Sequence, residues 1–244
     1  MRKLMFLQYA VLAVVMALFG LAAFGLLMVD FLFPGTFKDW YLFQGGMQLN
    51  LVLLLMFGLQ HSVMARRPLK QFLGRLMPEE LVLSTYVMIS GFTLFVLAAL
   101  WSPMAPPLYD LRGTAWEWPL LAGPALGAFI VGWTGFLMGG KDLIGLGSVL
   151  RIWREEKYAD IPFSTPGLYK YVRHPLYFGV LLVIWITPSM THDHLFFSEV
   201  MTAYTLIGIW FEERDLVRRY GEDYVKYQRR TPMLIPFLKL GKRA

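Results

Sequence analysis

QYAVLAVVMALFGLAAFGLLMVDFLF (residues 8–33) is a predominantly apolar stretch whose length indicates the fold class of the chain. A helix needs about 20 apolar residues to cross the hydrocarbon core of a bilayer. The preceding residues, beginning MRK, give the segment the basic start of a signal peptide, but no clear small-x-small cleavage site follows the apolar part. We therefore expect a retained first membrane helix.

The composition of the whole chain is that of an integral membrane protein. Of its 244 residues, 57% are hydrophobic and only 16% are charged. The mean hydropathy is +0.50, which a soluble domain of this size would seldom show. Cysteine is absent, so a disulfide framework, a thiolate metal site and a cysteine nucleophile are all excluded.

Further apolar windows follow the first one along the chain. Windows of full or nearly full spanning length occur at 47–65, 81–101 and 118–138, and two more candidates lie at 175–186, which is short, and 195–211. We predict an all-α, polytopic membrane helix bundle with about six transmembrane helices, the last two forming a hairpin. We treat 1–244 as one domain, with a four-helix transmembrane part over 1–140 and a cofactor-binding hairpin and cytoplasmic tail over 141–244.

Lysine and arginine are unevenly distributed among the connecting segments. With the N-terminus inside and about six crossings, all of the 23 basic residues except Lys38 and Arg112 fall on the cytoplasmic side, as the positive-inside rule requires. Both termini are then cytoplasmic. Topology and contact with anionic lipid headgroups account for the net charge of +6, so nucleic-acid binding is not needed to explain it.

The stretch YKYVRHPLYFG (169–179) places an arginine and a histidine directly before a proline, at the start of an apolar run. Proline is favoured at the first position of a helix, so Pro175 is predicted to begin the fifth helix. Arg173 and His174 then lie at its N-terminal end, where free N–H groups and the helix dipole attract anions. We expect this end to suit a carboxylate or a phosphate.

Two residues of the same run extend this candidate site. Gly179 lies one turn beyond Pro175 on the same face, where a missing side chain lets a ligand or another helix approach. Tyr177 offers a ring and a hydroxyl nearby. Under the alternative interpretation, Arg173 and His174 only face lipid headgroups, and Gly179 is a packing glycine.

Glu212 and Glu213 are predicted to close an apolar helix at its C-terminal end. The helix dipole disfavours negative charge there, and a carboxylate next to the membrane is costly without a partner. Successive helical residues point about 100° apart, so one glutamate is expected to face a site. The alternative is that both glutamates pair with the following Arg214 and Arg218.

The short turn 187–193 joins the two helices that carry these motifs, so the helices are expected to lie antiparallel and side by side. The basic pair and the acidic pair then meet at the same cytoplasmic edge. A site with a carboxylate-seeking half and an amine- or ribose-seeking half matches an amino-acid-like zwitterion that carries a sugar. S-adenosylmethionine is one such molecule.

RHPLYFG (173–179) followed by Glu212 and Glu213 resembles the C-terminal signature of the isoprenylcysteine carboxyl methyltransferase and phospholipid methyltransferase superfamily of integral membrane enzymes. The bacterial methanethiol S-methyltransferases of the NnrU-like branch are most similar over three stretches: GLQHSVMAR (58–66), TPGLYKYVRHP (165–175) and IGIWFEERDL (207–216). Some sterol reductases resemble the same C-terminal region and use a nicotinamide cofactor, so the signature alone leaves reductase chemistry open.

The resemblance implies an activity: metal-free methylation of methanethiol to dimethyl sulfide by S-adenosylmethionine, in the bacterial inner membrane. Other acceptors, namely hydrogen sulfide, another small thiol, a prenylcysteine carboxylate or a lipid amine, remain open, as does a non-enzymatic membrane protein. The resemblance also implies that the cofactor carboxylate lies near the histidine and that a glutamate holds the ribose hydroxyls or the amino group. The implied cofactor-binding residues are Tyr169, Val172, Arg173, His174, Tyr177, Gly179, Glu212 and Glu213.

A thiol acceptor must lose its proton, because the thiolate is the nucleophile. His61 is our candidate for the general base, since an ionisable residue in a membrane helix suggests function and histidine titrates near neutrality. The alternative is an interhelical hydrogen-bond cluster of Gln60, His61 and Ser62. Arg214 is a second catalytic candidate, because a cation beside the thiol would lower its pKa.

Three small or polar residues precede the glutamates on the last apolar window. Tyr204 and Gly208 recur at helical spacing before Glu212, and Thr205 is adjacent to them. We predict that they line an apolar pocket for the methyl acceptor, although a packing stripe is the commoner meaning of such a pattern.

His192 and His194 lie close together in MTHDHLFF (190–197). The segment is predicted on the outer side of the membrane, and no further metal ligand is apparent nearby. We therefore expect no metal site there, and expect Asp193 or Thr191 to cap the next helix.

Overall fold

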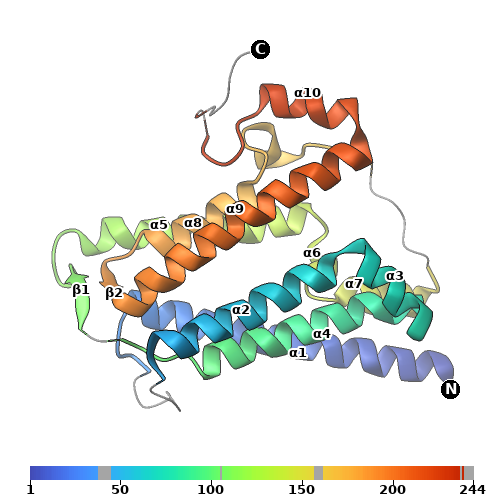
Figure 1. Cartoon of the computed structure of the whole chain (residues 1–244), viewed down its shortest axis with the longest axis horizontal. Helices are drawn as coiled ribbons and strands as arrows, with labels where there is room; N and C mark the ends of the chain where they lie inside the picture. The colour runs from blue at the N-terminus through green and yellow to red at the C-terminus, as the bar shows by residue number, and fades with distance from the viewer. Residues whose placement is uncertain (38–44, 105, 157–161, 237, 239–244) are drawn as a thin grey trace. The chain divides into compact units, whose positions relative to one another are not determined.

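The computed structural model describes residues 1–37, 45–104, 106–156, 162–236 and 238 (Figure 1). These residues are mainly helical, and four of their helices are long and apolar enough to cross a membrane: α1 (Arg2–Leu32), α2 (Gly46–Ala65), α4 (Glu79–Ala99) and α5 (Glu117–Leu137). They match the first four predicted windows, so the chain is a membrane protein built mainly of helices. Lys38, which is predicted to lie outside the membrane, falls outside the described residues.

The chain divides into two compact units. The first unit comprises 1–110, 139–159 and 189–197, and the second comprises 111–138, 160–188 and 198–244. Helix α9 (His192–Tyr220) starts in the first unit and continues through the second.

In the first unit, α1 packs against α4 through small residues. A Cβ atom added to Gly20 would collide with the backbone of Gly91, and one added to Gly91 would lie 2.5 Å from the carbonyl oxygen of Met16. Tyr9 and Thr85 share a hydrogen bond of 2.9 Å between the same two helices. Close backbone approach combined with an interhelical hydrogen bond is typical of membrane helix pairs.

Short helices occupy the hydrophilic connections of the first unit. They are α3 (Arg67–Leu76), α6 (Gly140–Leu143) and α7 (Leu146–Arg154). Arg151 pairs with Asp142 at 2.7 Å, which joins α7 to α6. Lys3 pairs with Glu155 at 2.7 Å, which joins the start of α1 to the end of α7.

A small antiparallel sheet joins the predicted turn 187–193 to the connection between α4 and α5. Strand β1 (Pro107–Asp110) pairs with β2 (Ser189–Thr191), so the all-α prediction omits this two-stranded element. At the start of α9, Thr191 accepts a hydrogen bond from the backbone N–H of His194 at 3.3 Å, which confirms it as a cap. Asp193 instead accepts hydrogen bonds from the indole of Trp101 at 2.9 Å and the backbone N–H of Met104 at 3.1 Å.

In the second unit, α8 (Pro175–Trp185) packs against α5. The helix begins at Pro175, as predicted, and His174 is its N-cap residue. A Cβ atom on Gly179 would lie 2.8 Å from the carbonyl oxygen of Gly127 in α5. The partner that approaches Gly179 is therefore another helix.

Helix α9 corrects one prediction, because Glu212 and Glu213 lie inside the helix and not at its C-terminal end. The segment 214–220 contains neither glycine nor proline, so the helix continues to Tyr220. It stops at Gly221, whose φ of 57° favours glycine. These carboxylates therefore do not lie at the C-terminal end of the helix, where the dipole disfavours negative charge.

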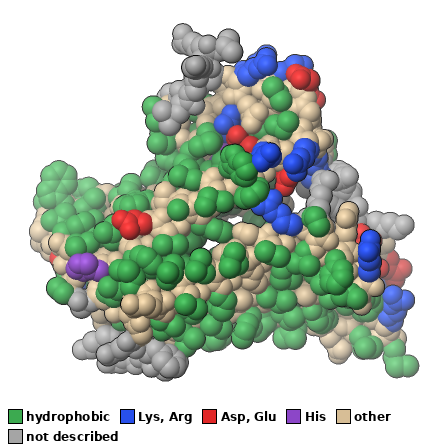
Figure 2. Space-filling model, in the orientation of Figure 1, with side chains coloured by type: hydrophobic (Ala, Val, Ile, Leu, Met, Phe, Trp, Pro, Cys, Tyr) green, Lys and Arg blue, Asp and Glu red, His purple; other side chains and the backbone are tan. Residues whose placement is uncertain are grey.

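Helix α10 (Glu222–Arg230) follows Gly221, and the short helix η2 (Gly167–Lys170) precedes α8. Figure 2 shows hydrophobic side chains covering the long helices, and charged side chains gathered over α10 and the C-terminal part of α9. The exposed basic residues of these two elements are Arg214, Arg218, Arg219, Lys226, Arg229 and Arg230. The charged side chains of these elements are therefore concentrated around α10 and the C-terminal part of α9.

Candidate functional site

The backbone of Arg173 and His174 is held by the segment that follows α10. The N–H of Arg173 donates to the carbonyl oxygen of Pro232 at 2.9 Å, and the N–H of His174 donates to that of Met233 at 3.1 Å. His174 is buried, with only 3% of its surface exposed. The backbone of residues 173–174, directly before α8, is thus held in a fixed position.

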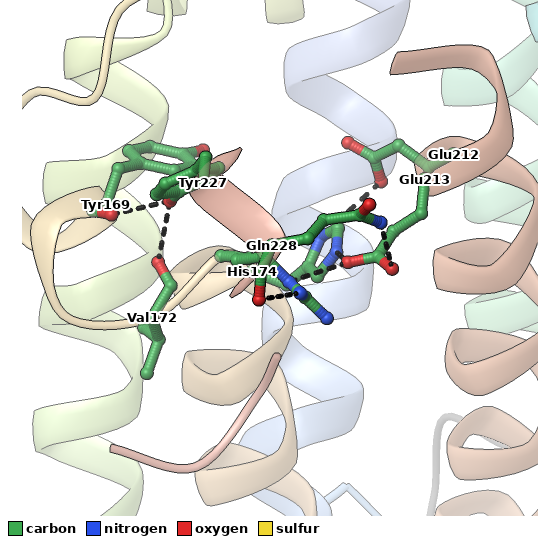
Figure 3. Close-up of polar contacts among 8 residues, drawn as sticks. Tyr169, Val172, His174, Glu212, Glu213, Tyr227 and Gln228 are labelled. Atoms are coloured by element: carbon green, nitrogen blue, oxygen red, sulfur yellow. Dashed lines mark hydrogen bonds and ion pairs between the residues drawn. The ribbon is translucent and has the colours of Figure 1, made fainter. Parts of the chain in front are cut away.

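The carboxylate of Glu213, in α9, is the centre of a charged cluster that it forms with Arg173 and His174 (Figure 3). Its Oε1 lies 2.8 Å from Nε of Arg173 and 3.1 Å from Nε2 of His174. Its Oε2 accepts a hydrogen bond of 3.0 Å from the side-chain amide of Gln228, in α10. The charged cluster and its amide partner Gln228 therefore come from three separate parts of the sequence.

Glu212 is oriented differently from Glu213. Its side chain is 43% exposed, against 16% for that of Glu213, and its Oε2 lies 3.9 Å from Nδ1 of His174. Of the two glutamates, Glu213 therefore faces the cluster, while Glu212 lies at its solvent-exposed edge.

Opposing effects set the charge state of Glu213. Burial alone would raise its pKa, but the hydrogen bond from His174, the positive charge of Arg173 and the hydrogen bond from Gln228 together lower the pKa below the usual 4.5. Glu213 is therefore ionised at neutral pH. Its partner Arg173 precedes it by 40 positions in the numbering, so pairing with the arginines that follow Glu213 does not describe this carboxylate.

Those following arginines have other contacts. The guanidinium of Arg214 lies over the ring of Trp210, 4.5 Å from its centroid. Arg218 pairs with Asp215 at 3.1 Å. Both arginines nevertheless line an open groove of about 370 Å³ in the second unit, together with Trp210, Glu213, Val217 and Gln228. The groove gives a ligand access to the charged cluster.

A second, apolar hollow of about 430 Å³ lies on the same helix. Its lining residues are Leu206, Ile207, Trp210 and Phe211. Trp210 lines both hollows, so a polar and an apolar surface adjoin along α9.

Tyrosines fix the chain that leads into the cluster. The hydroxyl of Tyr227 donates to the carbonyl oxygen of Tyr169, and lies 3.4 Å from that of Val172. Burial and the charge of Glu212 raise the pKa of Tyr169 to about 12. Burial and the neighbouring Tyr169 also raise the pKa of Tyr227. Both hydroxyls therefore remain protonated donors at physiological pH.

The remaining predicted cofactor and acceptor residues lie on α8 and α9, and none of them lines either hollow. The ring of Tyr177 lies 5.7 Å from that of His174. In α9, Thr205 is buried and Tyr204 is half-buried. A Cβ atom on Gly208 would meet nothing within 4 Å, so this glycine is not forced by packing.

His61 belongs to the first unit, whereas the charged cluster belongs to the second. Its ring nitrogens lie 3.1 and 3.2 Å from the hydroxyl of Tyr86 in α4, and its ring stacks on Phe57. The neighbouring Gln60 accepts a hydrogen bond of 2.9 Å from Thr93, also in α4. These contacts favour the interhelical cluster for Gln60 and His61, and the role of His61 as a base stays a prediction.

The sequence pattern does not indicate that α10 contributes to the site. Tyr227, Gln228 and the carbonyls of Pro232 and Met233 all contact the predicted site. In the sequence they belong to a polar stretch, GEDYVKYQRRTPM (221–233), that has the composition of a solvated helix and loop. No spacing pattern within this stretch indicates a site, because its contacts are with residues more than fifty positions away or on another helix.

A family model described as "Protein of unknown function (DUF1295)" matches residues 124–231. That range contains Arg173, His174, Glu213 and Gln228. No solved structure matches the chain.

The chain is also similar to named proteins. It is 43% identical to a methanethiol S-methyltransferase of Crocosphaera subtropica, over 79% of this chain and 74% of that protein. It is 39% identical to one of Mycobacterium tuberculosis, over 77% of both chains. Nurim of Danio rerio is 26% identical over 78% of this chain and 70% of its own length.

Proposed function

The chain belongs to the methanethiol S-methyltransferase family, and we propose that it methylates methanethiol to dimethyl sulfide with S-adenosylmethionine as methyl donor. The observation that carries the proposal is the meeting of Arg173, His174 and Glu213 beside an open groove. Cationic and anionic groups in one place suit a zwitterionic amino-acid moiety, because each charge of the ligand finds a complementary partner.

The cluster fits the chemistry of this cofactor. Arg173 and His174 would hold its carboxylate, and Glu213 or Glu212 would hold its amino group or ribose hydroxyls. Tyr169, Val172 and Tyr177 would shape the same pocket, and Gly179, which packs against Gly127 of α5, would fix the position of α8. S-adenosylmethionine supplies an electrophilic methyl group on a sulfonium, so the reaction as proposed needs no metal ion.

The thiol must be deprotonated before it attacks. The thiolate sulfur forms a bond to the methyl carbon while the bond from that carbon to the sulfonium sulfur breaks, giving two thioethers. Most of the acceleration then comes from alignment of donor and acceptor. We propose that His61, whose ring contacts the hydroxyl of Tyr86, is the base that accepts the thiol proton. Arg214 would act by favouring the thiolate.

The acceptor is expected to lie along α9, near Tyr204, Thr205 and Gly208. The space beside Gly208 supports this assignment, because a Cβ atom there would meet no neighbour. The apolar hollow beside the groove is lined by other residues of α9, namely Leu206, Ile207, Trp210 and Phe211. Methanethiol is small and apolar, so such a surface next to a charged groove suits a reaction between this thiol and a charged cofactor.

We further propose that the protein crosses the bacterial inner membrane about six times, with α8 and α9 as the last hairpin and both termini in the cytoplasm. The distribution of basic residues supports this orientation. The hydrogen bonds that join α8 to α9, from Ser198 to the carbonyl of Ile184 at 2.7 Å and from Trp185 to Thr202 at 2.8 Å, support the hairpin.

The test is a methylation assay on detergent-purified protein supplied with S-adenosylmethionine and methanethiol, with headspace detection of dimethyl sulfide. We expect product from the parent protein, none from Glu213→Gln, and a large loss in His61→Ala. His192→Ala is the matched control, because His192 is exposed and lies far from α9's glutamates in sequence; it should retain activity.

Each alternative outcome has its own meaning. Product from His61→Ala at the parent rate would remove His61 from the mechanism while preserving the function. A parallel assay with hydrogen sulfide, followed by detection of methanethiol, tests the nearest alternative acceptor. Bound S-adenosylhomocysteine without any volatile product would contradict methanethiol as the acceptor and would favour a lipid amine or a prenylcysteine carboxylate.

A further inference from the structure

Gln228 contacts both halves of the charged cluster from a single position on α10. Its side-chain amide donates to Oε2 of Glu213 at 3.0 Å. Its backbone carbonyl oxygen accepts a hydrogen bond of 2.9 Å from the guanidinium of Arg173. Figure 3 shows Gln228 beside His174 and extending toward Glu213. One residue therefore reaches the carboxylate on α9 and the cation that precedes α8.

The two oxygens of Glu213 have different partners. Oε1 faces Arg173 and His174, and Oε2 faces the amide of Gln228. The terminal torsion of a glutamate side chain is broad and roughly two-fold, so contacts to one oxygen alone would leave the carboxylate plane loosely defined. The amide of Gln228 supplies the second constraint.

The helix that carries Gln228 is itself well anchored. Tyr227 donates to the carbonyl oxygen of Tyr169, and Tyr224 is only 2% exposed. Phe163 packs against both tyrosines, with ring centroids 5.7 Å from Tyr227 and 5.9 Å from Tyr224. The position of Gln228 relative to the cluster is thus set by packing, as a supporting residue requires.

We infer that Gln228 is a positioning residue of the cofactor site, which orients the carboxylate of Glu213 toward the amino-acid moiety of S-adenosylmethionine. The inference rests on the proposed function, and it assigns a role to a residue outside the predicted site. Gln228 acts through Glu213, so its loss should weaken cofactor binding without removing any charge of the cluster.

Two substitutions separate positioning from packing. Gln228→Met keeps the length of the side chain but removes the amide donor, and it should weaken S-adenosylhomocysteine binding about tenfold, because a carboxylate loses a hydrogen bond. Gln228→Glu places a second carboxylate against Glu213, so one of the pair should hold a proton at higher pH than usual. The protonated carboxyl can donate to Glu213 as the amide does.

Binding by Gln228→Glu should therefore be weak at about pH 8 and should recover toward the parent value at about pH 5.5. A defect in packing alone would show no such recovery. The titratable and charged groups around this position are common to parent and variant, and they are Tyr169, Arg173, His174, Glu212, Arg214, Arg218, Tyr224 and Tyr227. Because these groups titrate in both proteins, the affinity of the variant is divided by that of the parent at each pH.

The experiment is isothermal titration of S-adenosylhomocysteine into full-length, detergent-purified protein. Lys226→Gln is the control, because it changes the charge of α10 by the same amount as Gln228→Glu at an exposed position; it should bind like the parent. Melting temperatures of the ligand-free variants provide a second readout that does not depend on binding.

The outcomes are distinct. Parent-like affinity of Gln228→Met, or weak binding by Gln228→Glu that does not recover at low pH, would overturn the positioning role alone. Absence of binding by the parent protein would overturn the proposed function and this inference with it. Weakened binding in both variants, with recovery of Gln228→Glu on acidification, is the result we expect.

Discussion

Glu213 accepts contacts from an arginine, a histidine and an amide within one cluster. A carboxylate in this environment is stabilised in its ionised form, so protonation should weaken the fold around it. Because the folded-state pKa of Glu213 is lower than the usual 4.5, the unfolded chain binds a proton more readily than the folded one. The stabilisation is therefore present above about pH 4.5 and is lost as the pH falls through the folded-state pKa.

This gives a prediction for Glu213→Gln. At neutral pH the variant should be less stable than the parent by about 1–3 kcal/mol, because Arg173 and His174 lose an ionised partner. The difference should shrink below pH 4.5, where protonation removes the same charge from the parent. Thermal unfolding of both proteins across this range measures it.

Glu212→Gln is the matched control for that measurement. Its side chain is 43% exposed, so the substitution should change stability much less. A stability difference between parent and Glu213→Gln that stayed constant down to low pH would contradict the assigned cause.

The sequence predicts the charged residues of the site but not its amide. Arg173, His174 and the two glutamates border apolar windows, where an ionisable side chain stands out. Gln228 lies in a polar stretch, where a glutamine is ordinary. The choice between Glu212 and Glu213 also depends on the rotation of α9 against α8, which neighbouring side chains decide and the hydrophobic pattern alone does not.

The glycines of helices α8 and α9 have different surroundings. A Cβ atom on Gly179 would lie 2.8 Å from the carbonyl oxygen of Gly127, whereas one on Gly208 would meet nothing within 4 Å. Alanine at 179 must therefore push α8 away from α5, while alanine at 208 adds helix propensity without a clash.

We predict that Gly179→Ala lowers the free energy of unfolding by about 1–3 kcal/mol, and that Gly208→Ala leaves it unchanged or slightly raised. Denaturation of the two purified variants in the same detergent compares them directly. Equal stability of both variants and the parent would show that α5 and α8 do not need close contact at Gly179.

The ends of the elements show what local sequence determines. The start of α8 is predicted correctly because proline has a strong preference for the first helical turn. The end of α9 is predicted wrongly because the apolar run stops before the helix does. The pairing of β1 with β2 is missed as well, since it joins segments some eighty residues apart and neither shows strand alternation.

The sequence predicts the four long apolar helices of the chain because span length is a direct requirement of the bilayer. The count of about six crossings stays a prediction, since α8 has only 11 residues. Whether so short a helix crosses depends on its neighbours and on the local bilayer, which hydropathy does not encode.

The absence of cysteine from the chain makes this topology directly measurable. We predict that Ala115→Cys is labelled by a membrane-impermeant maleimide in intact cells, because the segment between α4 and α5 is expected on the outer side. Lys226→Cys, on α10, should be labelled only after the membrane is permeabilised. Both positions are exposed, so labelling in permeabilised cells is the control for each.

The reverse pattern would overturn the proposed orientation. Labelling of both variants in intact cells would place α10 and the segment around Ala115 on the same side, and would contradict the predicted number of crossings between them.

The backbone pairing of Arg173 and His174 with Pro232 and Met233 has a mechanical consequence. Tension applied to the chain beyond Met233 would reach these two hydrogen bonds before it reached α10 or any apolar helix. Under load the chain would therefore release residues 173–174 first, and ligand affinity would fall while the helices were still embedded. Ligand binding would therefore be the first property of the protein to respond to tension on the segment that follows α10.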